Sequence, residues 1–206
     1  MPRTLAIGVL ALLLCGCVAV GSDKPLFSAA DAGGPGLRPG LWSIPNDKCM
    51  FDPATPVAAW PTCANATEVR DGRLIGGFGK TDGPAQSLDY VLAAGDPSVV
   101  QLKAPADRKA TDPEYVYFGL EPTQTDKAGR VVEAHVWMVL CFKPPLDKSA
   151  RQPAPYPGLT MRKGDGFCRA IAPGPIRNAA RLSRDASVQG DKVWLLARWL
   201  RDRASD

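Results

Sequence analysis

Residues 130–142 read Arg-Val-Val-Glu-Ala-His-Val-Trp-Met-Val-Leu-Cys-Phe, and this stretch decides the class of fold. One face of it is wholly apolar and comprises Val132, Ala134, Val136, Met138, Leu140 and Phe142. The opposite face is mixed and comprises Val131, Glu133, His135, Trp137, Val139 and Cys141. A period of two over this length is typical of an antiparallel strand with one face on a core and the other partly in water.

Shorter alternating segments precede this strand and are separated by turn residues. We expect three hairpins, formed by residues 67–70 and 73–76 around Asp71-Gly72, by residues 87–94 and 98–104 around Gly95-Asp96-Pro97, and by residues 115–121 and 130–142 around the polar loop 122–129. Asp-Gly between two alternating runs is the strongest short-range signal for a hairpin. Much of the chain up to Phe142 therefore reads as a series of antiparallel strands.

The chain after Phe142 has a different pattern. Residues 144–158 contain five prolines and are expected to form a loop. Residues 176–186 have a helical period, with Ile176, Ala179, Ala180 and Ser183 on one side, and residues 191–201 fit either a helix or a closing strand, of which we favour the strand. The sequence therefore predicts a mainly β fold: an antiparallel sheet closed as a small barrel or a sandwich, with one short C-terminal helix.

Length and composition limit the classes of function. The chain has 206 residues, enough for one domain with its own core, and its net charge of +4 is too low to favour a general nucleic-acid binder. Its one histidine, His135, excludes a His-rich zinc site and an HExxH metalloprotease helix. His135 beside Glu133 and Trp137 could form a general base with a stacking platform. We assign no catalytic residue, metal or cofactor from the sequence.

The N-terminal residues have the pattern of an export signal. Arg3 precedes an uncharged, mostly apolar run over residues 4–14. Leu14-Cys15-Gly16-Cys17 follows and resembles the lipobox of bacterial lipoproteins, with Cys15 where Ala or Ser is commoner. The resemblance implies a diacylglyceryl group on the Cys17 thiol, removal of residues 1–16 as the signal peptide, and acylation of the new amino group by a fatty acid such as palmitate.

The same resemblance implies a location. Val18 stands where some inner-membrane lipoproteins carry Asp, so we expect an outer-membrane anchor with the protein facing the periplasm. The expected partners are the lipid bilayer, through acylated Cys17, and an envelope protein or an anionic lipid surface, but no nucleic acid. A signal peptide cut elsewhere and an uncleaved span over residues 4–20 are the alternatives, and both also export the body of the protein.

Small residues and chain breakers dominate the sequence after the acceptor cysteine. We expect residues 17–36 to form the lipidated cysteine and a flexible tether, with a typical span of roughly 25 Å. Residues 37–206 then form a single domain.

Four further cysteines remain for this domain: Cys49, Cys63, Cys141 and Cys168. An even number in an exported domain predicts disulfides, and we favour the pairs Cys49–Cys63 and Cys141–Cys168. The alternative is a four-cysteine metal site, but ligand pairs in zinc sites usually lie two to four residues apart, and these cysteines do not.

Positive charge is concentrated near the C-terminus. Residues 161–206 carry ten Lys and Arg against five acids. Arg177, Arg181 and Arg184 would share one face of the helix, and Arg198 and Arg201 follow. Such a surface could face anionic lipid headgroups or an acidic partner, whereas the alternative is an ordinary solvated face.

Three short motifs carry further resemblances. Gly40-Leu41-Trp42 resembles the Gly-x-Trp at the first strand of lipocalin-like barrels. With Cys49, Cys63 and Asp71-Gly72 it is similar to the small barrel inhibitors of bacterial secreted metalloproteases, which implies a protease inhibitor. Leu37-Arg-Pro-Gly-Leu-Trp42 is similar to a run in uncharacterised proteobacterial envelope lipoproteins and implies no activity. We expect a non-enzymatic envelope lipoprotein, a binding or structural module, with a protease inhibitor and an envelope hydrolase as the alternatives.

Overall fold

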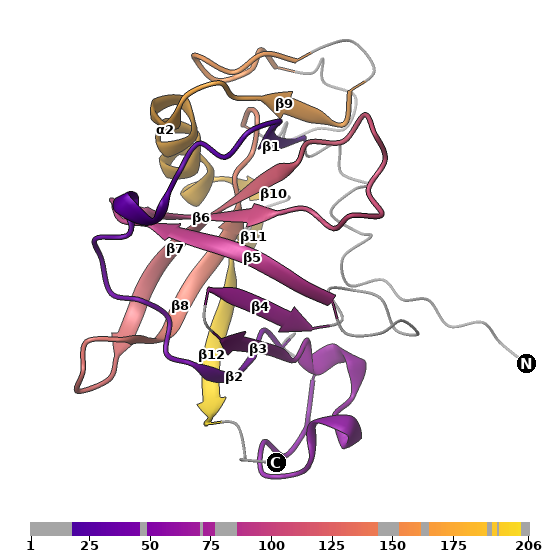
Figure 1. Cartoon of the computed structure of the whole chain (residues 1–206), viewed down its shortest axis with the longest axis vertical. Coiled ribbons are helices and arrows are strands. Elements are labelled where there is room, and N and C mark those ends of the chain that lie inside the picture. Colours follow the sequence, from indigo (N-terminus) through magenta and orange to yellow (C-terminus); the bar gives the residue numbers. More distant parts are fainter. Residues whose placement is uncertain are drawn as a thin grey trace, which may run out of the picture.

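The structure, a computed structural model, describes residues 18–45, 49–70, 72–76, 86–143, 153–161, 165–188, 191–192 and 194–202 (Figure 1). Its main part is a closed antiparallel barrel. The barrel strands are β2 (Gly40–Ser43), β3 (Thr67–Arg70), β4 (Arg73–Gly76), β5 (Gln86–Ala93), β6 (Ser98–Lys103), β7 (Tyr115–Thr125), β8 (Val131–Met138) and β12 (Leu195–Arg201). They pair in the order β6–β5–β4–β3–β2–β12–β8–β7, and β7 pairs back with β6. Of the two predicted architectures, the barrel is confirmed.

The remaining elements lie outside the barrel wall. Strands β1 (Ala19–Ser22) and β9 (Phe167–Arg169) extend the sheet beyond β7, and β10 (Ser187–Val188) pairs with β11 (Asp191–Lys192). Helix α2 (Pro173–Arg184) packs on β6, β7 and β8, and short 3-10 turns are formed by η1 (Ala29–Asp31), η2 (Val57–Ala59) and η3 (Thr62–Ala64). The predicted short helix late in the chain is thus confirmed.

The predicted hairpins form. The strands of the first, β3 and β4, have the predicted bounds, whereas the ends of the other two hairpins are shifted. Strand β7 continues past Glu121 to Thr125, although residues 122–129 were expected to be a loop. Pro122 is tolerated because pairing with β6 ends at Leu120, so this part of β7 has an edge with no strand to receive a donor. Strand β8 ends at Met138 rather than Phe142, because Leu140 leaves β7 and pairs with Ala19 of β1. The strand favoured for residues 191–201 is present as β12.

Because successive residues of a strand point to opposite faces, the strands contribute side chains to two separate cores, one inside the barrel and one outside it. Every barrel strand contributes apolar side chains to the interior, including Trp42, Val69, Leu74, Tyr90, Leu102, Phe118, Ala134 and Ala197. A second core lies between the outer wall and α2, where Ile176, Ala179, Ala180 and Ser183 of the helix are buried as predicted. The indole N–H of Trp137 donates to the Ala180 carbonyl at 2.9 Å, so the mixed face of β8 holds the helix.

Gly40 opens β2 with a positive φ of 126°, which explains why a glycine stands before Trp42. A Cβ at this position would also meet the Arg201 carbonyl of β12, with which β2 pairs. Trp42 is buried, and its indole N–H donates to the Arg38 carbonyl at 2.8 Å. The Gly-x-Trp motif therefore starts the first barrel strand and anchors it to the segment before it.

The expected flexible tether over residues 18–36 is wrong, because this segment belongs to the fold. All four residues of β1 are buried, and they pair antiparallel with β7 and parallel with β9. Phe27 is 3% exposed and its ring meets the ring of Tyr117 edge-on. The sequence lacks a period here because a four-residue strand buried on both faces has no polar side to alternate with.

A buried glutamine holds the same segment against the barrel. The Gln101 side-chain oxygen accepts from the backbone N–H groups of Leu26 and Phe27 at 2.8 and 2.9 Å, and its amide donates to the Phe27 carbonyl at 2.9 Å. The Tyr117 hydroxyl lies 2.6 Å from that of Ser22. These bonds satisfy polar groups that burial would otherwise penalise, so the segment is fixed rather than loosely packed.

Candidate functional site

The expected lipid-attachment residue, Cys17, lies outside the described residues, but its neighbour Val18 does not. The Val18 carbonyl accepts a hydrogen bond from the Cys141 N–H at 2.8 Å, and the Val20 N–H donates to the Val139 carbonyl at 2.9 Å. On the other edge of β1, Val20 pairs with Cys168. The residue directly after Cys17 is therefore already bonded into the sheet.

The two disulfides are those that the sequence favoured, Cys49–Cys63 and Cys141–Cys168. The second joins the two segments that hydrogen-bond β1, since Cys141 donates to Val18 and Cys168 pairs with Val20. Both of its cysteines are fully buried. The Cys141–Cys168 bond therefore covalently links two segments that hydrogen-bond the chain at β1.

The first disulfide lies at the other end of the barrel, in the loop between β2 and β3 (Figure 1). Phe51 and Trp60 pack with their ring centroids 5.0 Å apart within this loop, and Leu41 of β2 packs beside them. The Arg201 guanidinium donates to the Ala54 and Thr55 carbonyls at 3.0 and 2.8 Å. The loop is thereby attached to β12 as well as to β2.

The structure does not gather the five arginines of the expected basic surface into a free cationic patch. Arg177 donates to the Ala94 carbonyl at 2.5 Å, and Arg184 lies 3.5 Å from Asp96 and from Glu121. Arg198 donates to Glu133 at 2.7 Å, and Arg201 binds the loop carbonyls described above. Arg181 donates to Asn178 at 2.9 Å and is exposed. Four of these cations are thus joined to carboxylates or carbonyls of the barrel and its loops.

His135 lies on the outer face of β8, where the sequence had placed it with Glu133 and Trp137. Trp137 is 2% exposed and lies under α2, so it cannot serve as a stacking platform for a ligand. The ring that stacks on His135 is instead that of Trp194, with the centroids 3.9 Å apart. Glu121 of β7 is the cross-strand neighbour of His135. We call His135, Trp194, Glu121, Glu133 and Arg198 the His135 face.

Glu133 is held as an ionised carboxylate. One of its oxygens accepts from the Thr123 hydroxyl at 2.9 Å and the other from Arg198 at 2.7 Å. The Thr123 hydrogen bond, followed by the bond and the charge of Arg198, lowers the pKa of Glu133. The charge of His135 contributes in the same direction. Because both oxygens already accept hydrogen bonds and the pKa is lowered, this carboxylate is a weak proton acceptor.

Sequence patterns alone did not identify Trp194 and Glu121 as part of this face, or Thr123 as a partner of Glu133. The register of β7, β8 and β12 decides which residues lie side by side on this face. It aligns Glu121 with His135, and His135 with Leu196 of β12. The available signal was the alternation along β7 and β12, in which every second residue points outward. Using it required knowing that these strands flank β8.

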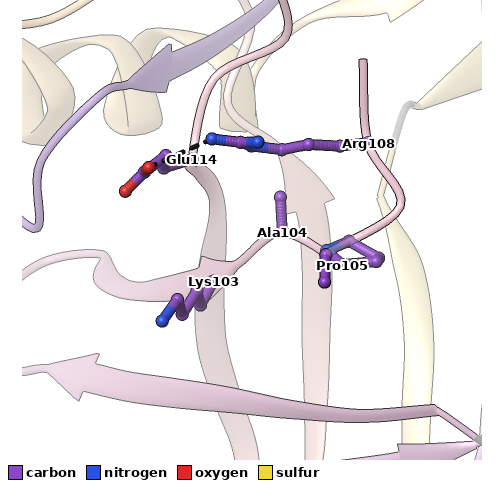
Figure 2. Close-up of a pocket in the computed structure, with 6 residues that line it drawn as sticks. Lys103, Ala104, Pro105, Arg108 and Glu114 are labelled. Atoms are coloured by element: carbon purple, nitrogen blue, oxygen red, sulfur yellow. Dashed lines mark hydrogen bonds and ion pairs between the residues drawn. The ribbon is translucent and has the colours of Figure 1, made fainter. Parts of the chain in front are cut away.

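A small pocket of about 170 Å³ lies at the turn between β6 and β7 (Figure 2). Lys103, Ala104, Pro105, Ala106, Arg108 and Glu114 line it. Arg108 reaches across to Glu114 at 3.1 Å, and the Ala104 N–H donates to the Glu114 carbonyl at 2.7 Å. Its volume is below the roughly 300–1,000 Å³ usual for small-molecule sites, and the ion pair gives Arg108 and Glu114 a structural role.

The barrel interior is the larger apolar surface. Val100, Leu102 and Leu120 are buried there, whereas Leu74, Leu88, Tyr90, Leu92, Val116, Phe118 and Val136 are only partly buried. By contrast, the outward-facing Val99, Gln101, Tyr117 and Trp137, which α2 and the N-terminal segment cover, are each at most 3% exposed. The interior is therefore less completely covered than the outer core.

Comparison with models of protein families, with curated proteins and with solved structures gave no match to this chain. No helix within the described ranges has the length and apolar character needed to cross a membrane. Within those ranges, too, no three His, Cys, Asp or Glu side chains gather in an arrangement that could hold a metal ion.

Proposed function

We propose that this protein is a membrane-anchored envelope lipoprotein, attached through acylated Cys17, and that its barrel is a non-enzymatic binding module. The observation that carries the proposal is the hydrogen bond from Cys141 to the Val18 carbonyl. Cleavage before Cys17 would leave this hydrogen bond and every described element intact. Lipid on Cys17 would then join β1, which lies between β7 and β9, to the membrane.

The apolar interior supports the binding role. Eight-stranded barrels are just wide enough either to fill with side chains or to hold one small ligand. The partly buried Leu88, Tyr90 and Phe118, on the interior side of β5 and β7, favour the second case. An apolar small molecule is the class of ligand that such a lining would take.

Intact mass spectrometry of the protein extracted from membranes tests the anchor. We expect a chain that begins at Cys17 and carries the mass of a diacylglyceryl group and a further acyl chain. A second measurement after reduction should add the four hydrogens of two disulfides. A chain with the mass of its bare amino acids would overturn the proposal. Native mass spectra of the same sample would show whether an apolar molecule remains bound.

The protease-inhibitor alternative needs a free N-terminal segment that can enter a protease cleft. In this structure Phe27 is buried and Gln101 binds the backbone of Leu26 and Phe27. These contacts favour the binding module over the inhibitor. An inhibition assay against metalloproteases and serine proteases separates the two, since the binding module should leave both classes active.

The hydrolase alternative would rest on His135. A broad screen for hydrolytic activity, followed by the variant His135→Ala, tests it. Any activity that the variant lost would support the hydrolase, and the non-enzymatic proposal predicts no activity to lose. The bonds that hold Glu133 on Thr123 and Arg198 favour the second outcome.

A further inference from the structure

We infer that the protein has no tether, and that one face of the fold lies directly on the phospholipid headgroups of the membrane that holds its anchor. The inference rests on the proposed lipidation of Cys17 and specifies the surface that the lipid engages. We call this surface the anchor face: Val18, Lys143, Tyr156, Met161 and Phe167.

The first step is the length of free chain between lipid and fold. Consecutive Cα atoms lie about 3.8 Å apart, so the Cys17 Cα must lie that close to the Cα of Val18. Val18 is bonded to Cys141, and Ala19 pairs with Phe167 and bridges to Leu140. A single peptide unit therefore separates the acylated residue from the sheet. The roughly 25 Å of slack that a flexible linker over residues 17–36 would give does not exist.

The second step is what surrounds that point. Val18, Tyr156 and Met161 are partly buried side chains at the margin of the outer core, and Phe167 is partly exposed on β9. The Tyr156 N–H donates to the Cys141 carbonyl at 2.8 Å, which fixes this loop beside the anchor point. Lys143 follows two residues after Cys141 and is exposed. Apolar side chains bordered by a tyrosine and a lysine suit the interfacial layer of a bilayer.

The third step is orientation. The acylated end of the chain enters where β1 meets Leu140, just after the end of β8. The turn between β7 and β8, which contains Lys127, lies at the other end of β8 (Figure 1). A strand of eight residues spans about 26 Å, so this turn and its exposed Lys127 would stand well away from the headgroups. Lys127 is therefore a control for Lys143 within the same molecule.

The test compares the lipidated protein with a variant that has about twelve Gly and Ser residues inserted between Cys17 and Val18, a span of about 20 Å. Both are placed in vesicles of phosphatidylethanolamine and phosphatidylglycerol and treated with a water-soluble amine-acylating reagent. The rates of modification of Lys143 and Lys127 are read from peptide masses. We expect Lys143 to react several-fold more slowly, relative to Lys127, in the natural chain than in the insertion variant.

Equal relative rates of Lys143 in the two proteins would overturn the inference. The lipid mass on Cys17 is measured on the same samples, which separates the two claims. Loss of that mass contradicts the proposed anchor, whereas a lipidated protein with an unprotected Lys143 contradicts only the absence of a tether. The inserted residues precede Val18, the first of the described residues, so the variant keeps every described contact, and the urea unfolding curves of the two proteins should coincide.

Discussion

The hydroxyl oxygens of Tyr117 and Ser22 lie 2.6 Å apart, buried where the N-terminal segment crosses the outside of the barrel. Ser22 also donates to the Lys24 carbonyl at 2.6 Å, so its hydroxyl proton is already used and Tyr117 is the donor between the two. Tyr117 is 1% exposed. Burial raises the pKa of Tyr117 to about 12 from 10.0.

This raised pKa predicts loss of stability at alkaline pH. Between pH 10 and 12 the unfolded chain releases the tyrosine proton while the folded protein keeps it, so the free energy of unfolding falls as the pH rises. A difference of about two pKa units corresponds to roughly 2–3 kcal/mol. Urea unfolding at pH 9 and pH 11 should show about half of this loss, because pH 11 lies midway between the two pKa values. Tyr117→Phe should reduce it, at a cost of about 1 kcal/mol at pH 9 from the lost hydrogen bond.

Two other tyrosines provide an internal comparison for the Tyr117→Phe variant. Burial also raises the pKa values of Tyr90 and Tyr156, so part of the alkaline loss should persist in Tyr117→Phe. A variant whose alkaline slope equals that of the natural protein would show that Tyr117 is not the buried titrating group.

Gly119 is a position at which one added methyl group should destabilise the fold. It pairs across the sheet with Trp137, whose indole covers it, and a Cβ at residue 119 would overlap that ring. Trp137 cannot move away easily because its N–H is bound to the Ala180 carbonyl of α2. We expect Gly119→Ala to lower the free energy of unfolding by about 1–3 kcal/mol in chemical denaturation. Gly36→Ala is the matched control, because nothing lies within 4 Å of a Cβ there.

The hairpins could be predicted because their signals are local. Gly72 has the positive φ that the Asp71-Gly72 turn requires, and the strands on both sides of it alternate. Strand β1 could not be predicted, because its four residues are buried by partners about 95 and 148 residues away, which no local pattern reveals.

The candidate site, too, has parts that the sequence predicts and parts that it does not. Disulfides were predicted from the even count of cysteines, and the two favoured pairs are those that form. The stacking of His135 on Trp194 depends on the register between β8 and β12, and the sequence contains no local signal of that register. The neutralisation of Arg184 and Arg198 by Glu121 and Glu133 likewise depends on which strands lie side by side.

Glu133 should make the protein sensitive to acid. Its pKa is lowered in the fold, so its contribution is complete above its ordinary pKa of 4.5 and is lost as the pH falls through the lower, folded value. We expect Glu133→Gln to lower the free energy of unfolding by roughly 1 kcal/mol at pH 7 and to flatten its decline below pH 4.5. Asp89→Asn is the control, since its ion pair with Arg73 is exposed on both sides and should contribute little. An equal decline in both variants would contradict the role of Glu133.

Removal of the two disulfides should have different effects on the local stability of β1. Replacing both cysteines of a pair by alanine should lower the free energy of unfolding by about 3 kcal/mol for the loop of 14 residues and about 3.5 kcal/mol for the loop of 27. Only Cys141 and Cys168 belong to the segments that hydrogen-bond β1. Hydrogen exchange at Val20 should therefore become faster when the Cys141–Cys168 bond is removed and stay unchanged when Cys49–Cys63 is removed. Equal acceleration in both variants would mean that β1 is protected by global stability alone, and that the Cys141–Cys168 bond has no local effect on this strand.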